Sequence, residues 1–227
     1  MNLNLEQLIK ICNAKYLIGE NLVNQIDFKN IEIQHLLYDS RRLNFIDNTL
    51  FFAFKTTNND GHKYIKELYN KGIRLFICEE LQDLNQFPKA IFLLVKNSLE
   101  ALQKIAKYKR ENFHKEVVAI TGSNGKTIVK EWIVQLAQEN KKICYSPRSY
   151  NSQIGVALSL WQLNTNYDLG LFEAGISKPN EMTRLQEMIQ PTIGIFTNIG
   201  SAHQINFKTI EEKIEEKLKL FTSCHTL

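Results

Sequence analysis

The amino-acid sequence predicts an α/β protein in which a small mixed α/β domain precedes a second domain built on a parallel sheet. Two observations carry this prediction. Short apolar runs alternate with helical segments through the second half of the chain, which is typical of βαβ units with a parallel sheet covered on both faces. A glycine-rich loop ending in Gly-Lys-Thr also stands between a predicted strand and a predicted helix. A polar stretch at 111–115 separates the two parts, so we place the domains at residues 1–114 and 115–227.

The first domain is expected to open with a helix, because Leu5, Leu8, Ile9 and Cys12 recur at helical spacing. Apolar runs bounded by polar turns predict strands at 31–38, 50–54, 73–78 and 91–95, and helices at 64–72 and 98–113. The helix at 64–72 ends in a glycine, as left-handed C-caps prefer. Ser98 is a candidate N-cap for the last helix of this domain.

In the second domain the predicted strands and helices alternate. The strands are expected at 117–121, 142–145, 169–173 and 193–197, and the later helices at 154–163, 181–189 and 211–221. The first helix follows the glycine loop and is expected to place Val129, Trp132, Ile133 and Leu136 on one face. Ligands bind at the carboxyl ends of parallel strands, so polar residues at those ends mark the candidate site.

The composition excludes several classes of function. The chain of 227 residues carries a net charge of +4, and its basic residues interleave with acidic ones. Because no polybasic tract is present, we expect no nucleic-acid partner. The start lacks the features of a signal peptide, and no stretch reaches the roughly 18 apolar residues that a membrane span needs. Four widely spaced cysteines indicate free thiols, so we expect a cytoplasmic protein. We also expect a monomer without a membrane span.

The glycine loop lies in the segment Ala119–Thr127, which reads Ala-Ile-Thr-Gly-Ser-Asn-Gly-Lys-Thr. Such a turn can direct several backbone N–H groups at phosphate oxygens, and the following helix adds its positive N-terminal end. Lys126 is then expected to neutralise the β- and γ-phosphates of ATP, and the Thr127 hydroxyl to hold Mg²⁺. Ile120 stands where the general phosphate-loop pattern has its first glycine, so this loop differs from that of most P-loop ATPases.

This form of the loop resembles that of the Mur ligases and the related folylpolyglutamate synthetases. Three earlier segments are similar to the UDP-binding front domain of the Mur ligases: Asp-Ser-Arg at 39–41, Asn-Thr-Leu-Phe-Phe-Ala-Phe at 48–54 and Asp-Gly-His-Lys-Tyr-Ile at 60–65. A hydroxyl and an arginine fork suit uracil or pyrophosphate oxygens, although a capped turn with a surface arginine has the same residues. The substrate-binding residues that the resemblance implies are Asp39, Ser40, Arg41, Asp60 and His62.

Four later segments also resemble the family: Tyr-Asn-Ser-Gln-Ile-Gly at 150–155, Glu-Ala-Gly-Ile-Ser at 173–177, Thr-Asn-Ile-Gly-Ser-Ala-His at 197–203 and Glu-Lys-Leu-Lys-Leu-Phe at 216–221. The ATP contacts that this implies are Thr121, Gly122, Ser123, Asn124, Gly125, Lys126, Thr127 and Asn151. The implied catalytic residues are Lys126, Glu173, His203 and Lys217, and the implied Mg²⁺ ligands are Thr127, Glu173 and His203. Lys217 aligns with a carbamylated lysine of the family, and Lys219 is the weaker alternative. The chain departs from the pattern at Ser152 and Ala157, where the family has asparagine and proline.

The resemblance implies ATP-driven amide formation through an acyl phosphate, with ATP and Mg²⁺ as cofactors. Residues 173–182 look most like the members, of the MurF type, that add D-alanyl-D-alanine to UDP-N-acetylmuramoyl-tripeptide, including a form fused to alanine racemase. The alternatives are a MurE-type ligase that adds the third amino acid, a folylpolyglutamate synthetase-like ligase and a non-catalytic ATP-binding module. Since the family continues through a third domain that binds the incoming amine, we expect a truncated central domain and no turnover by this chain alone.

Overall fold

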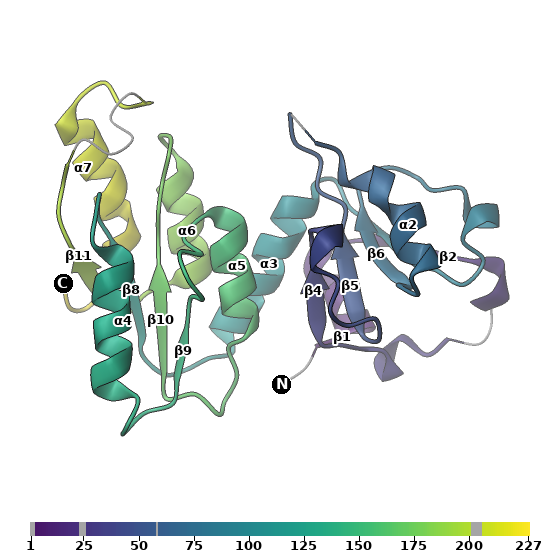
Figure 1. The fold of residues 1–227 in the computed structure, drawn as a ribbon, viewed down its shortest axis with the longest axis horizontal. Helices are drawn as coiled ribbons and strands as arrows, with labels where there is room; N and C mark the ends of the chain where they lie inside the picture. The colour runs from purple at the N-terminus through teal and green to yellow at the C-terminus, as the bar shows by residue number, and fades with distance from the viewer. Residues whose placement is uncertain (1–2, 23–25, 58, 201–205) are drawn as a thin grey trace. The chain divides into compact units, whose positions relative to one another are not determined.

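Mainly parallel sheets organise both halves of the chain in the computed structural model (Figure 1). The structure describes residues 3–22, 26–57, 59–200 and 206–227. The chain divides into two compact units, Met1–Ile105 and Ala106–Leu227. The division falls inside helix α3 (Ser98–Glu111), whereas the sequence placed it in the polar stretch that follows this helix.

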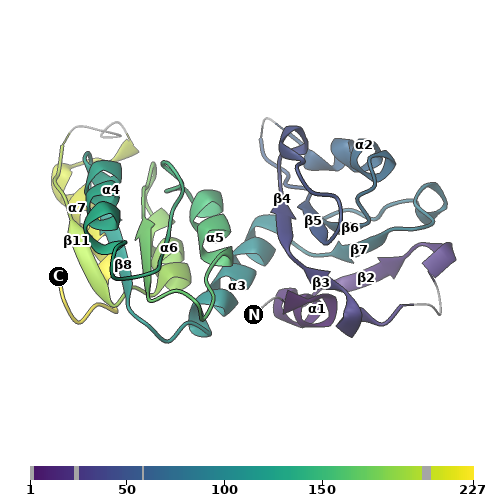
Figure 2. The same ribbon diagram turned by 60° about the horizontal axis from the view of Figure 1, so that its bottom comes forward.

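The first unit contains a five-stranded sheet of order β2-β7-β6-β5-β4, in which only β2 runs antiparallel to its neighbour (Figure 2). A separate antiparallel pair joins β1 to β3. The strands are β1 (Leu3–Asn4), β2 (Lys15–Ile18), β3 (Glu32–Ile33), β4 (His35–Leu37), β5 (Thr49–Phe52), β6 (Leu75–Cys78) and β7 (Ile91–Leu94). The helices are α1 (Leu5–Cys12), α2 (Ile65–Asn70) and α3, with 3₁₀ turns η1 (Glu20–Leu22), η2 (Phe28–Asn30), η3 (Ser40–Arg42), η4 (Gly61–Tyr64) and η5 (Leu84–Gln86).

The core of the first unit is aromatic at its centre. Phe51, Phe76 and Phe92 lie on three adjacent parallel strands and are fully buried. The rings of Phe76 and Phe92 stack with centroids 5.1 Å apart, and Phe51 meets Phe76 edge to face. This packing holds the strands in register, so that their carboxyl ends form one edge of the sheet.

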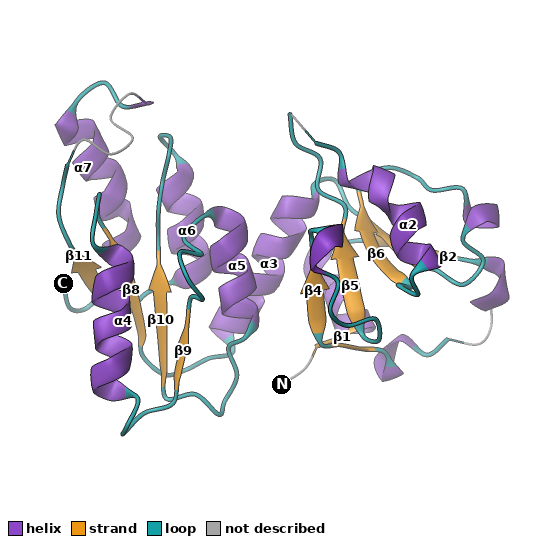
Figure 3. Cartoon of the chain, in the orientation of Figure 1, coloured by secondary structure: helices purple, strands orange, loops and turns teal. Residues whose placement is uncertain are grey.

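The second unit contains a four-stranded, fully parallel sheet of order β11-β8-β10-β9. Its strands are β8 (Val117–Thr121), β9 (Ile143–Tyr145), β10 (Leu169–Glu173) and β11 (Ile193–Phe196). Its helices are α4 (Lys126–Ala137), α5 (Gln153–Trp161), α6 (Glu181–Ile189) and α7 (Ile210–Leu218), followed by η7 (Lys219–Phe221). Helix α4 packs on one face of the sheet, while α5 and α6 contact each other on the other (Figure 3). Right-handed crossovers require this division, since β8 to β9 and β9 to β10 cross the sheet in opposite directions.

The predicted strand at 31–38 forms two strands instead of one. β3 pairs with β1, whereas β4 pairs with β5 in the larger sheet. The chain passes between the two sheets at Gln34, where the N–H groups of Gln34 and His35 both donate to the Asn48 carbonyl. Apolar periodicity cannot reveal this change of partner, because both strands share one uninterrupted pattern.

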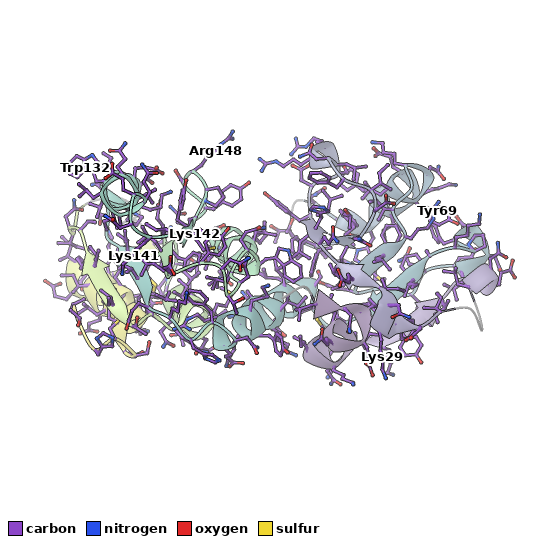
Figure 4. The ribbon with its side chains drawn as sticks, turned by 90° about the horizontal axis from the view of Figure 1, so that it is seen from below. Lys29, Tyr69, Trp132, Lys141, Lys142 and Arg148 are labelled. Atoms are coloured by element: carbon purple, nitrogen blue, oxygen red, sulfur yellow. The ribbon has the colours of Figure 1, made fainter. Side chains whose placement is uncertain are left out.

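The predicted apolar face of α4 is only partly correct. Val129 and Ile133 pack against the sheet, but Trp132 is 61% exposed and Leu136 is 81% exposed (Figure 4). The place of these two residues is taken by Val134 and by Lys130, which is fully buried. The sequence predicted the helix but oriented it wrongly, because a lysine was not expected on the inner face.

Ser98 is the first residue of α3 and not its cap. The Asn97 side chain accepts a hydrogen bond from the Glu100 N–H group at 2.9 Å, which is the capping contact. Ser98 instead donates from its N–H and hydroxyl groups to Glu79. The four cysteines are free thiols, as expected. None of the described helices combines the length and apolarity that crossing a membrane requires.

Candidate functional site

The loop after β8 is shaped by two glycines with positive φ. Gly122 has φ +146°, and a Cβ atom there would lie 2.0 Å from the Thr197 hydroxyl oxygen. Gly125 has φ +81° and precedes the first residue of α4, with open space around it. Only glycine can adopt this φ at position 122 and also leave room for the Thr197 hydroxyl. The resulting tight turn leads directly into the N-terminus of α4.

A segment after β11 braces this loop. The Ser123 N–H group donates to the Asn198 carbonyl at 2.9 Å, and the Asn124 N–H group donates to the Asn198 side chain at 3.0 Å. The Thr197 hydroxyl donates to the Asn124 carbonyl at 2.6 Å. Because β11 and β8 are parallel neighbours, the two strand ends deliver the loop and its brace to the same place. The loop is therefore held in shape by the protein itself.

Two lysine ammonium groups converge on one backbone carbonyl in the loop. Lys126 Nζ lies 2.8 Å from the Gly122 oxygen, and Lys217 Nζ, from α7, lies 3.1 Å from the same atom. Burial lowers the pKa of Lys126. Burial, followed by the neighbouring charges of Lys126 and Lys213, lowers the pKa of Lys217 to about 8. The arrangement concentrates positive charge where a phosphate would sit.

Glu173 ends β10 with its side chain fully buried against α4. Its Oε2 atom accepts a hydrogen bond from the Thr127 hydroxyl at 3.0 Å. Its Oε1 atom lies 2.9 Å from the ammonium of Lys130 and accepts no hydrogen bond within the described part of the chain. A carboxylate so far from water requires a cation beside it, and Lys130 is that cation in this structure.

A cavity of about 130 Å³ opens at this edge of the sheet. It is lined by Gly122, Ser123, Lys126, Asn151, Ser152, Gln153, Gly175, Ile176, Ser177, Glu181 and Lys217. Asn151 is fixed by its backbone, whose carbonyl accepts from the Gly175 N–H group at 2.8 Å. Ser152 caps α5, since its hydroxyl oxygen accepts from the Gly155 N–H group at 3.2 Å. The departure from asparagine at 152 thus leaves a normal helix start.

The residues present fit a magnesium ion. The Thr127 hydroxyl and the Glu173 carboxylate are hard oxygen donors beside the loop, and Mg²⁺ is bound in proteins by one or two such oxygens together with phosphates and water. No group of three or more His, Cys, Asp or Glu side chains converges anywhere in the described ranges. His203, which the sequence assigned to the metal, lies outside the described residues. Lys219, the alternative to Lys217, pairs with Glu216 at 2.6 Å.

In the first unit, Asp39 and Arg41 bind each other. The Arg41 guanidinium donates two hydrogen bonds of 2.8 Å to the two carboxylate oxygens of Asp39, and the Arg41 N–H group adds a third of 3.1 Å. These side-chain hydrogen bonds lower the pKa of Asp39 to about 2. The Arg41 side chain is 87% exposed, whereas Ser40 is buried. The arginine fork that would meet a diphosphate is thus held by Asp39 in this conformation.

Asp60 and His62 form a second polar group in the same unit. His62 Nδ1 lies 2.6 Å from Asp60 Oδ1, and His62 Nε2 accepts from the Glu79 N–H group at 2.9 Å. Hydrogen bonds from the backbone and then the ring of His62 lower the pKa of Asp60. Both ring nitrogens are therefore engaged within the protein, so the geometry gives His62 a role in fixing the loop after β6.

Sequence reasoning missed Lys130 and the brace at Thr197 and Asn198. Lys130 follows Thr127 by three residues, so helical spacing places both on the side of α4 that faces Glu173. That spacing was the available signal. No local pattern predicted that Thr197 and Asn198 would contact the loop, because only the last residue of the motif at 197–203, His203, was assigned a role.

Family models match both units of the chain. Residues 32–110 match the model described as "Mur ligase family, catalytic domain", and residues 120–226 match the "Mur ligase middle domain". Asp39, Arg41, Asp60 and His62 lie within the first match. The loop glycines, Lys126, Glu173 and Lys217 all lie within the second match.

Curated relatives and solved structures agree with these matches. UDP-N-acetylmuramoyl-tripeptide–D-alanyl-D-alanine ligase of Borreliella burgdorferi is 34% identical over 204 residues, covering 86% of this chain and 44% of the relative. The enzyme of the same name from Rickettsia prowazekii is 37% identical over 172 residues, covering 76% of this chain and 38% of the relative. The chain thus spans less than half the length of these curated relatives.

Among solved structures, MurF from Acinetobacter baumannii has a TM-score of 0.86 at 23% identity, covering 99% of this chain and 47% of that one, which shows a shared fold. MurF ligase from Thermotoga maritima, solved in complex with ADP, has a TM-score of 0.74 at 28% identity over 86% of this chain and 45% of its own. A UDP-N-acetylmuramoyl-L-alanyl-D-glutamate–2,6-diaminopimelate ligase has a TM-score of only 0.57 at 13% identity, covering 99% of this chain and 46% of that one. The loop, the buried carboxylate and the two family matches together place this chain in the Mur ligase family.

Proposed function

We propose that this chain supplies the UDP-substrate and ATP sites of a ligase that adds D-alanyl-D-alanine to UDP-N-acetylmuramoyl-tripeptide in peptidoglycan precursor synthesis. The observation that carries the proposal is the pair of ammonium groups, Lys126 and Lys217, on the Gly122 carbonyl beside the buried carboxylate of Glu173. This arrangement suits the polyphosphate of a nucleotide and its metal ion.

In this function the terminal carboxylate of the tripeptide attacks the γ-phosphorus of ATP, and ADP leaves. The amine of D-alanyl-D-alanine then attacks the acyl carbon, and phosphate leaves as the amide forms. Lys126 and the N–H groups at the start of α4 stabilise negative charge on the transferring phosphoryl group. The brace from Asn198 occupies the N–H groups of Ser123 and Asn124, and it holds the shape of the loop before the nucleotide arrives.

A magnesium ion held by Thr127 and Glu173 would neutralise charge on the phosphates. Lys217 is the candidate for carbamylation, because a lysine with its pKa lowered to about 8 has a larger neutral fraction near physiological pH than an ordinary lysine. Reaction of that amine with CO₂ forms an N–C bond and releases a proton, which converts a cation into an anion. The change would leave Lys126 and Lys213 facing an anion instead of a third ammonium group.

The first unit is proposed to bind the UDP end of the substrate through Asp39, Ser40 and Arg41. The Arg41 side chain is exposed and already oriented by Asp39, so a diphosphate can replace the carboxylate without reordering the turn. Asp60 and His62 are proposed to support this site by fixing the neighbouring loop.

The names and likenesses of the relatives support the D-alanyl-D-alanine-adding ligase over the ligase that adds the third amino acid. Titration with UDP-N-acetylmuramoyl-tripeptide and with the corresponding dipeptide tests this choice, since the dipeptide is the substrate of the alternative. Preference for the tripeptide is expected. Preference for the dipeptide would favour the alternative, and binding of ADP without either UDP compound would favour a non-catalytic ATP-binding module.

The decisive comparison uses Arg41→Ala, measured by calorimetry with UDP-N-acetylmuramoyl-tripeptide. We expect the affinity to fall roughly tenfold, because one charge-assisted contact to a diphosphate is lost. The matched control is Lys10→Ala, which removes another exposed ion pair, with Glu6, from the same unit. Equal affinity in both variants would contradict the assignment of the UDP site.

A further inference from the structure

Lys130 is a lysine that the proposed chemistry does not use, yet it is among the most deeply buried side chains of the protein. Its exposed fraction is 0%, although it lies in α4 between exposed and half-buried neighbours. Burial of an ammonium group is costly unless several acceptors surround it. The positions of those acceptors therefore indicate what the side chain is for.

Two of the acceptors are carbonyls in the loop after β9. Lys130 Nζ donates to the Ser146 oxygen at 2.7 Å and to the Arg148 oxygen at 2.5 Å. Arg148 has φ +51°, a left-handed conformation that is unfavourable for a residue with a side chain. Its guanidinium projects away from the unit, so only its backbone faces the lysine (Figure 4). Lys130 thus holds a strained turn three residues before Asn151.

Two carboxylates also form ion pairs with the ammonium group. Glu131 Oε1 lies 3.1 Å away, but that side chain is 47% exposed and water shares its charge. Glu173 Oε1 lies 2.9 Å away and is completely buried. Its other oxygen, Oε2, is held by the Thr127 hydroxyl. The carboxylate is therefore fixed from both sides by α4, with Lys130 as its buried counter-charge.

We propose that Lys130 is a positioning residue that supplies an internal counter-charge to Glu173 and fixes the Ser146–Asn151 loop, so that the metal and nucleotide site exists before either ligand binds. The proposal rests on the proposed function in treating Glu173 as a metal ligand. Lys130 reaches no part of the 130 Å³ cavity and so acts only through Glu173 and the loop. One ammonium group links three segments: α4, the loop before α5 and the end of β10.

The test is a charge cycle measured by thermal unfolding in EDTA, without nucleotide. Lys130→Met removes the charge at similar side-chain length, and we expect Tm to fall by on the order of 10 °C, because a buried carboxylate loses its cation. The double variant Lys130→Met/Glu173→Gln is expected to recover at least half of that loss. Lys115→Met removes an exposed lysine paired with Asp168 and serves as the control, with a shift of about 2 °C or less.

The change in Tm on addition of Mg²⁺ distinguishes a charge that positions Glu173 from a side chain that only fills space. Saturating Mg²⁺ is expected to raise the Tm of Lys130→Met more than that of the unmodified chain, because the metal can supply the missing charge. This gain should be absent from the double variant, which lacks the carboxylate. Addition of Mg²⁺ to Lys115→Met should match the unmodified chain.

Each outcome decides the matter. Equal loss of stability in the single and double variants would overturn the proposal, since the lysine would then matter for packing and not for charge. If Lys130→Met fails to fold, a folded double variant supports the proposal, and failure of both overturns it. A normal charge cycle with no Mg²⁺ response in any variant would support the role of Lys130 while contradicting the metal site of the proposed function.

Discussion

The carboxyl-end edges of the two sheets both carry charged residues but use them differently. In the first unit, Asp39 is bound by Arg41, and Asp60 is bound by His62. In the second unit, Lys126 and Lys217 both donate to a backbone carbonyl and not to a carboxylate. The charged side chains at the first edge bind one another. At the second edge Glu173 is paired with Lys130, but Lys126 and Lys217 share a backbone carbonyl.

The difference predicts how an anion would change the charge interactions at each edge. An anion at the second edge relieves repulsion among lysines that already point at its position. An anion at the first edge must take Arg41 from Asp39, so the contact that Arg41 loses reduces the free energy gained on binding. We therefore expect charge removal to have opposite effects on stability at the two edges.

The largest effect is expected from Gly122→Ala. A Cβ atom at this position meets the Thr197 hydroxyl oxygen at 2.0 Å, and the φ of +146° is unfavourable for alanine. We expect a loss of about 3 kcal/mol or more in the free energy of unfolding, together with loss of ADP binding. Gly125→Ala is the control, because it has a positive φ but open space, and it should cost roughly 1 to 2 kcal/mol. Equal losses in urea unfolding would contradict the account of the brace.

The variant Lys126→Met tests whether this lysine binds phosphate or stabilises the fold. Affinity for ADP should fall roughly 10- to 100-fold, because a charge-assisted contact to phosphate is lost. Stability without nucleotide should stay equal or rise, since the variant removes a half-buried ammonium group beside Lys217. Calorimetry and thermal unfolding measure the two quantities. A variant that loses stability but keeps its ADP affinity would show that Lys126 is structural.

Lys217 gives a smaller effect that depends on pH. Burial and the charges of Lys126 and Lys213 lower its pKa from 10.5 to about 8, so the folded state binds fewer protons than the unfolded state between these values. Its contribution to stability therefore rises as the pH rises through this window and is unfavourable below pH 8. In ¹³C-bicarbonate, a carbamate signal should grow through about pH 8. Lys217→Met should abolish the signal, whereas Lys219→Met should keep it.

The smallest effect is expected at Asp39. Hydrogen bonds from Arg41 lower its pKa to about 2, so its contribution to stability is present above its ordinary pKa and is lost as the pH falls toward 2. Because the partner side chain is 87% exposed, the contribution should stay below about 1 kcal/mol. The difference in unfolding free energy between the unmodified chain and Asp39→Asn should be measurable at pH 6 and vanish near pH 2. A constant difference would show that Asp39 acts only as a turn cap.

Local patterns in the sequence were enough to predict the alternation of strands and helices and the phosphate loop. The loop could be predicted because its two glycines, its lysine and its threonine all lie within six consecutive residues. The same holds for Glu173, which ends a strongly apolar strand. The positions of these residues after strands follow from local patterns, whereas the role predicted for Glu173 came from the resemblance to the Mur ligases. The family model of the second unit spans residues 120–226, which include both features.

What the sequence could not predict depends on partners far along the chain. Lys130 is buried because Glu173 and the turn at Arg148 surround it. Its spacing from Thr127 within α4 indicates the side of the helix on which it lies but not the partners that surround it there. The break between β3 and β4 depends on Asn48, which lies in the next connection. Ser98 was predicted to be a cap because it stands where the helix was expected to begin. Its actual partner, Glu79, follows β6, and a local pattern cannot reveal a contact over that distance in the chain. The roles assigned to individual site residues stay predictions until the variants are measured.

The two tryptophans of the protein lie in contrasting surroundings in the second unit. Trp132 lies on the outer side of α4 (Figure 4) and is 61% exposed. Trp161 is 7% exposed at the end of α5. Trp132 is the sixth residue after Lys126 in α4, which places it about 9 Å further along the helix axis. The chain therefore has its own optical reporter: red-shifted, iodide-quenchable fluorescence from the helix that begins at the phosphate loop, and a blue-shifted signal from the interior as an internal reference.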